Sequence, residues 1–135
     1  MHDFNNESKL WVAWGGMVVG GSVLWAAYGR HGLTDAVIQE RWGIAVDYAR
    51  FMSLGLWCMV LMRVVAGFQR SRHWPERILV LGTGLFCGML FAESLWPTST
   101  LLITVGWLAP VGGILMTFSW LAFVLEFIRH ARSTP

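Results

Sequence analysis

Residues 10–28 contain no charged side chain. An α-helix rises about 1.5 Å per residue, so about 20 apolar residues are needed to cross a hydrocarbon core of about 30 Å. Comparable apolar stretches follow at residues 51–68, which include one arginine, 78–96 and 100–128. A chain of this kind folds by placing helices across a bilayer, not by closing an apolar core in water.

The composition agrees with a membrane protein. Only 13% of the residues are charged, whereas soluble domains carry about 25%. The net charge of +2 is small and the basic residues are spread along the chain, which argues against nucleic-acid binding. We expect a single transmembrane domain over residues 1–135, with the lipid bilayer as its main partner.

The pattern predicts an all-α, integral membrane four-helix bundle with short loops. The expected spans are residues 10–28, 44–68, 78–96 and 109–128. Thr34 and Asp35 are typical helix N-cap residues, so a charged helical stub should precede the second span. As one helix the last apolar stretch would exceed about 40 Å. Because a proline disfavours helical angles in the residue before it, Pro110 predicts a break near Ala109.

Basic residues beside the spans predict the orientation, since cytoplasmic loops carry an excess of arginine and lysine. Six such residues flank one side of the predicted spans and three flank the other. This distribution places both termini on the cytoplasmic side of the membrane. The six are Lys9, Arg70, Arg72, Arg77, Arg129 and Arg132, and the three are Arg30, Arg41 and Arg50.

Five polar residues on the outer side form a candidate cluster: Arg30, His31, Asp47, Arg50 and Glu93. An ionisable group within a span is costly and often functional, so Glu93 has either a structural role or a proton, ion or ligand role. We expect Glu93 to pair with Arg30 or Arg50, and His31 to anchor helices through Asp47 or Glu93.

Two other charged positions receive structural interpretations. Arg63 lies close enough to the end of its span to extend toward the interface. Glu126 has the spacing to pair with Arg129 and His130 on a solvated helix end.

Small residues recur at helical spacing, which lets membrane helices approach closely. We expect the packing residues to be Gly16 and Gly20 in the first span, Gly84 and Gly88 in the third, and Gly112 and Gly113 in the fourth. This pattern predicts the first and third spans as close neighbours. The same faces could instead form an interface with another protein.

No catalytic constellation is recognisable. The chain lacks a Ser/His/Asp set, paired carboxylates in one span, a phosphate-binding loop and a dinucleotide fingerprint. The histidines do not have the placement that a haem held between two spans requires, and no metal-ligand spacing is present. We expect neither enzymatic activity nor a cofactor.

Four residue groups occur together in a characteristic order and spacing: GRHGL at 29–33, AVDY at 45–48, GLFCGMLF at 84–91 and APVGGILMTFSW at 109–120. The set resembles the domain-of-unknown-function 423 family, small polytopic proteins of bacterial inner membranes with eukaryotic relatives. The resemblance extends over about residues 12–124. It implies a fold and a location, since the family has no established activity.

This chain departs from the family pattern at several polar positions. Met52 stands where the family has a second histidine, Ala49 where it has glutamine, and Ala109 where it has threonine. Residues 87–91 read CGMLF in place of SGSLY. His31 and the glycine pair at 112–113 match. The resemblance therefore implies a retained scaffold whose polar interior has become largely apolar.

These features favour a non-catalytic accessory subunit that packs with other membrane proteins in a respiratory or photosynthetic complex. The alternative is a small transporter, channel or sensor that uses the polar cluster around His31 and Glu93. A cofactor-binding membrane enzyme or electron-transfer subunit is the third possibility.

Overall fold

A computed structural model describes residues 6–67 and 73–133, and these residues form five α-helices and no strand. Four helices are long and apolar enough to cross a membrane, and the fifth, α4, is a short piece between two of them. This architecture confirms the predicted all-α membrane bundle. The helices are α1 (Asn6–His31), α2 (Ala36–Ala66), α3 (Trp74–Leu95), α4 (Thr100–Val105) and α5 (Leu108–Ser133).

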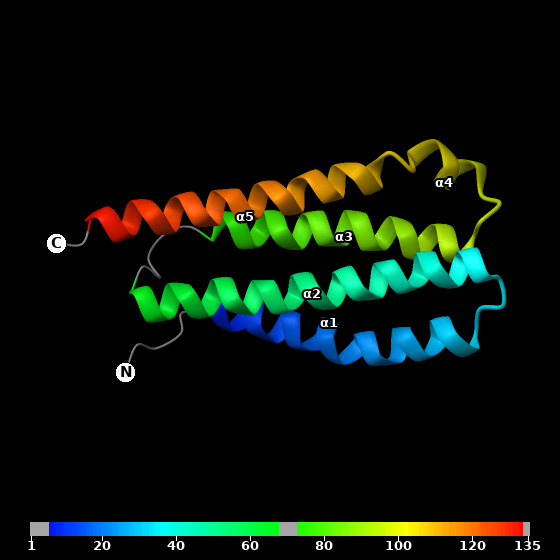
Figure 1. The fold of residues 1–135 in the computed structure, drawn as a ribbon, viewed down its shortest axis with the longest axis horizontal. Helices are drawn as coiled ribbons and strands as arrows, with labels where there is room; N and C mark the ends of the chain where they lie inside the picture. Colours follow the sequence, from blue (N-terminus) through cyan, green and yellow to red (C-terminus); the bar gives the residue numbers. More distant parts are fainter. Residues whose placement is uncertain (1–5, 68–72, 134–135) are drawn as a thin grey trace.

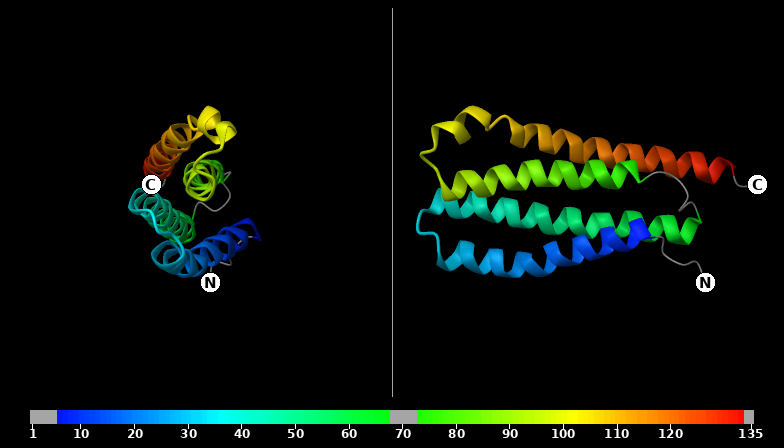
Figure 2. Two further views of the ribbon diagram at one scale, coloured as in Figure 1. Left: turned by 90° about the vertical axis from the view of Figure 1, so that its right-hand side faces the viewer. Right: turned by 180° about the vertical axis from the view of Figure 1, so that it is seen from behind.

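The long helices run antiparallel as two successive hairpins, α1–α2 and α3–α5 (Figure 1). Seen along the helices, α2 and α3 lie at the centre, with α1 and α5 on their outer sides (Figure 2). The beginning of α1 and the end of α5 lie at the same end of the bundle, which we call the terminal end. The opposite end carries the α1–α2 turn and α4, and we call it the turn end.

The helix boundaries follow from local chemistry. Asp35 caps α2, and its side chain accepts hydrogen bonds from the backbone N–H groups of Val37 and Ile38, as predicted from the sequence. Gly67 ends α2 in the left-handed conformation, at φ 75°, which glycine adopts without steric penalty. At 31 residues, α2 is about 46 Å long. It therefore extends beyond a hydrocarbon core and provides the predicted stub.

The predicted break in the last apolar stretch is confirmed, and it lies slightly earlier than expected. It falls at Gly106 and Trp107, while Pro110 stands in the first turn of α5. A proline is tolerated there because the first N–H groups of a helix have no intrahelical partner. The proline thus marks the beginning of the fourth span.

Close packing in the bundle depends on glycines that differ in part from those expected. Gly82 and Gly112 face each other where α3 crosses α5, and a Cβ atom added to Gly112 would lie 2.7 Å from the carbonyl oxygen of Gly82. Tryptophan rings use other glycines as contact surfaces between helices. These pairs are Trp57 on Gly15, Trp42 on Gly29 and Trp120 on Gly55.

Among the glycines named from the sequence, Gly112 lies at a close helix contact, and a Cβ atom added to Gly16 would lie 3.5 Å from the Trp57 ring. The remaining four face open space, where an added Cβ would meet no atom within 4 Å. They are Gly20, Gly84, Gly88 and Gly113.

The expectation that spans one and three are close neighbours is wrong. The main partner of α1 is α2, and α3 packs chiefly on α2 and α5. Contacts between α1 and α3 involve long side chains, such as the rings of Trp25 and Phe91, whose centroids lie 5.4 Å apart. The exposed faces of Gly20, Gly84 and Gly88 explain this difference, because none of them meets another helix of the chain.

The bundle exposes large apolar side chains and buries several polar ones, which is unusual for a soluble protein. Leu24 and Val65 are 73% and 76% exposed, whereas Ser53, Arg63 and Glu76 are fully buried. Such a surface is stable against lipid, which does not penalise exposed apolar side chains. The arrangement therefore supports a membrane protein independently of helix length.

Substitution of Gly112 by alanine should destabilise the bundle. The new Cβ would lie 2.6 Å from the backbone nitrogen of Phe86 and 2.7 Å from the Gly82 oxygen, and overpacking of this kind costs about 1–3 kcal/mol. Gly113→Ala is the matched control, because its Cβ would enter open space. Thermal unfolding in detergent, followed by circular dichroism, measures both; equal melting temperatures would contradict the proposed close approach.

Candidate functional site

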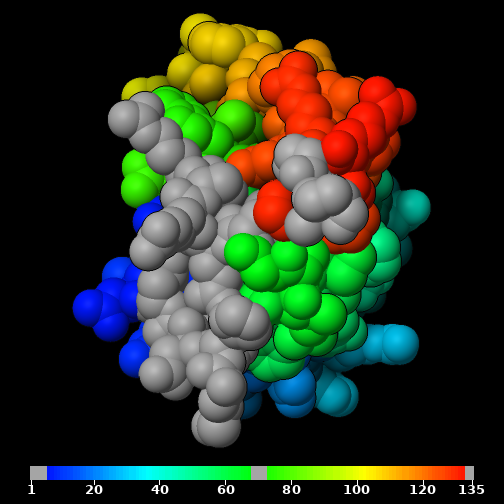
Figure 3. All heavy atoms as spheres, turned by 90° about the vertical axis from the view of Figure 1, so that its left-hand side faces the viewer, coloured from blue at the N-terminus to red at the C-terminus, as the bar shows by residue number. Residues whose placement is uncertain are grey.

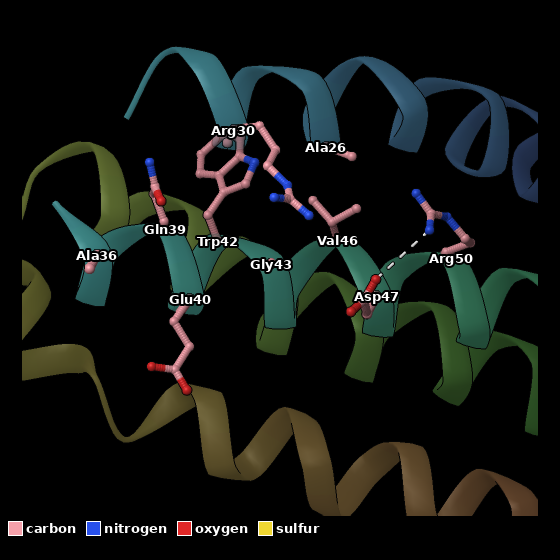
Figure 4. Close-up of a pocket in the computed structure, with 11 residues that line it drawn as sticks. Ala26, Arg30, Ala36, Gln39, Glu40, Trp42, Gly43, Val46, Asp47 and Arg50 are labelled. Carbon is pink, nitrogen blue, oxygen red and sulfur yellow. Dashed lines mark ion pairs between the residues drawn. The ribbon is translucent and has the colours of Figure 1, made fainter. Parts of the chain in front are cut away.

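Two polar sites lie at opposite ends of the bundle. The first is a cleft of about 400 Å³ between α1 and α2 at the turn end, which we call the turn-end cleft (Figure 4). Its charged and amide side chains are Arg30, Gln39, Glu40, Asp47 and Arg50, and Trp42 and Val46 also line it. Small residues on both helices, including Ala26, Gly29 and Gly43, leave the space between them open.

The indole of Trp42 fixes one wall of the cleft. Its Nε1 donates to the backbone oxygen of Trp25 at 2.6 Å, and its ring packs against Gly29 of α1. The rings of Tyr28 and Phe91 flank it, with centroids at 5.1 and 4.6 Å. These contacts join α1, α2 and α3 and hold the wall in place.

Two arginines approach the cleft from different helices. Arg50 donates from Nε to the Ser22 hydroxyl at 3.0 Å, and its Nη1 lies 3.8 Å from Asp47. Arg30 is exposed and makes no ion pair with any residue in the described ranges. In Figure 4 both guanidinium groups lie on the side of α2 that faces α1, near Val46.

The structure divides the five residues of the candidate cluster. Arg30, Asp47 and Arg50 meet at the turn-end cleft. Glu93 pairs instead with Arg41, at 3.5 Å. His31 is the exposed last residue of α1, and the described part of the chain shows no hydrogen bond from it to Asp47 or Glu93.

The second site is a group of charged side chains at the terminal end, which we call the terminal-end charge cluster. It consists of Arg63 from α2, His73 and Glu76 from the start of α3, and Glu126 from α5. The side chains of Arg63 and Glu76 are fully buried, and that of Glu126 is 28% exposed. Figure 3 views this end, where the ends of α2 and α5 lie against each other.

The guanidinium of Arg63 joins three helices. It binds Glu76 through two nitrogens, with Nη2 at 3.2 Å from Oε2, and the same Nη2 donates to Glu126 at 2.6 Å. His73 Nδ1 lies 3.4 Å from the Glu76 carboxylate, and the Phe123 ring lies 5.6 Å from the guanidinium carbon. A two-nitrogen contact with a carboxylate is the strong, directional form of this ion pair.

Neighbouring polar groups reinforce the cluster. The buried Ser119 hydroxyl of α5 donates to the backbone oxygen of Pro75 at 2.6 Å. His130 Nε2 lies 3.1 Å from the backbone oxygen of Ala66. The first contact joins α5 to the start of α3, and the second joins α5 to the end of α2. Side-chain contacts therefore connect all three helices at the terminal end.

The terminal-end charge cluster corrects two expectations from the sequence. Arg63 does not extend to the interface but is buried among carboxylates, and Glu126 pairs with Arg63 rather than with its helix neighbours Arg129 and His130. One feature of the sequence could have indicated this cluster. Arg63, Glu76 and Glu126 all lie near span ends, and antiparallel helices bring these ends to the same level. Residue spacing along one helix predicts ion pairs within that helix, but it does not predict contacts with other helices.

The chemistry of both sites is that of ion pairing and hydrogen bonding. Within residues 6–67 and 73–133, no group of three or more His, Cys, Asp or Glu side chains could hold a metal ion. In the terminal-end charge cluster the charged side chains pair with one another. The turn-end cleft leaves Arg30 available to a ligand.

Comparison with known proteins decides the family. A family model described as "Protein of unknown function (DUF423)" matches residues 25–113, well over half of the chain. The chain belongs to this family. The match includes the whole lining of the turn-end cleft as well as Arg63 and Glu76, and it ends before Glu126.

Two relatives illustrate how far the DUF423 family extends. A UPF0382 membrane protein of Schizosaccharomyces pombe is 34% identical over 104 residues, which cover 73% of this chain and 85% of that protein. A UPF0382 membrane protein of Staphylococcus epidermidis is 28% identical over 108 residues, covering 78% of this chain and 84% of that protein. No solved structure matches the chain significantly.

Removal of the Arg63 guanidinium should destabilise the bundle strongly. Arg63→Met leaves the buried Glu76 carboxylate without its main partner, and breaking a buried pair in this way costs about 3–5 kcal/mol. Arg77→Met is the matched control, because it breaks the exposed ion pair with Glu7 at 2.8 Å, which is worth about 1 kcal/mol or less.

Chemical unfolding in detergent micelles measures the difference. The triple variant Arg63→Met/Glu76→Gln/Glu126→Gln should recover part of the loss, since it also removes the buried carboxylates. Equal stability of the Arg63 and Arg77 variants would contradict a stabilising role for the cluster.

Proposed function

We propose that the chain is a non-catalytic integral membrane protein that packs, as one domain, into a larger membrane complex as an accessory subunit. A respiratory or photosynthetic assembly of a bacterial inner membrane is the kind of complex that fits. The proposal depends above all on helix surfaces that the chain's own fold leaves unused.

The exposed glycines of α3 are the observation that carries the proposal. Gly84 and Gly88 are one helical turn apart, and neither would bring an added Cβ within 4 Å of another atom. Leu81 on the same face is 57% exposed. Such small-residue strips allow a second membrane helix to approach closely and gain van der Waals contact. A helix of another protein is therefore the natural partner of this face.

The short connections support the same conclusion. The α1–α2 turn takes up residues 32–35, and residues 96–99 join α3 to α4. Within the described ranges nearly all side chains thus belong to the helices themselves. Contact with a partner would then occur mainly inside the bilayer.

The alternative of a transporter, channel or sensor requires His31 and Glu93 at one polar site. Glu93 is engaged by Arg41 and His31 is exposed elsewhere on the surface. No contact in the described part of the chain joins them, so the geometry favours the subunit role.

Enlarging the glycine strip should release partner proteins without unfolding the chain. The variant Gly84→Leu/Gly88→Leu adds volume in open space, so its melting temperature should remain close to that of the parent. Purification in mild detergent with quantitative mass spectrometry should show fixed-ratio partners for the parent and a loss of about tenfold or more for the variant. Val65→Leu, at a 76% exposed position of α2, is the control for a lipid-facing substitution.

Two outcomes would refute the subunit role. One is a parent protein that purifies alone in every mild detergent tested. The other is a folded double variant that keeps all its partners in the original ratio.

The proposed orientation, with both termini in the cytoplasm, has its own test. The described ends of α1 and α5 lie at the same end of the bundle (Figure 1), and most basic residues flank this end. Green fluorescent protein fused to the C-terminus should fluoresce, and alkaline phosphatase at the same position should be inactive. A cysteine at Leu33, in the α1–α2 turn, should react with an impermeant maleimide from outside; the reverse pattern would overturn the orientation.

A further inference from the structure

We propose that the turn-end cleft binds the head group of a phospholipid that carries a phosphate and a primary ammonium. Arg30 and Arg50 would hold the phosphate, and Asp47 would accept hydrogen bonds from the ammonium. This binding site is separate from the glycine strip of α3 and does not depend on the subunit role.

We place the mouth of the cleft at the level of the lipid head groups, because it opens at the end of the bundle that carries the α1–α2 turn. It opens beside the α1–α2 turn, and Trp25, which is 37% exposed, lies next to the buried Trp42 that forms one wall. Tryptophan rings of membrane proteins concentrate at this boundary between hydrocarbon and water. A ligand that enters from the surrounding lipid layer therefore reaches the cleft with its polar end already at the right level.

The phosphate assignment follows from the two guanidinium groups. They come from adjacent helices, and Figure 4 shows them on the face of α2 toward α1, one on each side of the Val46 side chain. Arg50 is held from one side by the Ser22 hydroxyl at 3.0 Å, which leaves its terminal nitrogens directed elsewhere. Arg30 has no ion-pair partner within the described residues. A planar guanidinium fork matches phosphate oxygens in both charge and geometry.

The ammonium assignment follows from the acidic residues of the same cleft. Asp47 lies 3.8 Å from Arg50, a long ion pair, and its side chain is 77% exposed. Glu40 lies at the rim and points away from α1 (Figure 4). Two arginines and two carboxylates leave the cleft without net charge. This balance suits a zwitterionic head group better than a net-anionic one.

The space available agrees with a small polar ligand. The cleft measures about 400 Å³, within the range of about 300–1,000 Å³ common for small-ligand sites. Ala26 and Gly43, on the two facing helices, leave room between the larger side chains that line it. A primary ammonium can donate hydrogen bonds to a carboxylate, whereas a quaternary ammonium cannot, so Asp47 should distinguish ethanolamine from choline head groups.

The full chain, delipidated in detergent, is titrated with phosphatidylethanolamine, phosphatidylcholine and phosphatidylglycerol of identical acyl chains, and bound lipid is measured by native mass spectrometry. Phosphatidylethanolamine should bind about tenfold more tightly than the other two, as expected for charge-assisted hydrogen bonds at both ends of the head group. Arg30→Gln should weaken its binding about tenfold, while Arg132→Gln, an exposed arginine of the last turn of α5, should have no effect. Arg30 is exposed, so its variant is expected to fold, and circular dichroism verifies this.

Two further measurements locate the chemistry. Asp47→Asn should abolish the preference for ethanolamine over choline head groups, while both lipids should still bind through their phosphate. Soluble phosphoethanolamine should not compete at concentrations comparable to those of the lipid; effective competition would indicate a soluble phosphate ester as the ligand and overturn the lipid assignment. Equal binding of the three lipids, or unchanged binding by the folded Arg30→Gln variant, would overturn the proposal as a whole.

Discussion

The buried pair of Arg63 and Glu76 connects the two halves of this protein. Both side chains are fully buried in the bundle, where water cannot solvate a charge, so the guanidinium needs protein partners. These partners are Glu76 of α3 and Glu126 of α5. The Arg63 side chain therefore connects α2, α3 and α5 at the terminal end, and the contacts of Ser119 and His130 reinforce this connection.

Close contact elsewhere follows a different principle. At the crossing of α3 and α5 the backbones meet through Gly82 and Gly112, whereas α1 and α2 are joined by tryptophan rings that lie on glycines. Lipid tails are as apolar as leucine, so apolar burial alone does not favour helix association in a bilayer. Small residues, which allow close contact between backbones, and directed polar contacts therefore stabilise the association of the helices.

The sequence predicted the fold class, the four spans, the Asp35 cap and the helix break, because these depend on local composition and residue chemistry. It did not predict the partners of Arg63 or Glu93, because these depend on how each helix is rotated about its axis. The i,i+3 spacing of Glu126 and Arg129 indicated a pairing within one helix, yet the carboxylate binds Arg63 of α2. Glycine spacing likewise identified helix faces with small residues, but it did not show which of these faces pack against another helix of the bundle.

The division into two hairpins has a consequence for biogenesis. Arg63 belongs to the first hairpin, whereas Glu76 and Glu126 both belong to the second. During synthesis the first hairpin leaves the ribosome with a guanidinium that has no carboxylate partner from α3 or α5. Its first carboxylate partner, Glu76, arrives with the start of α3, and its second, Glu126, arrives only with α5, so the pairing of Arg63 is completed in two steps that follow the order of synthesis.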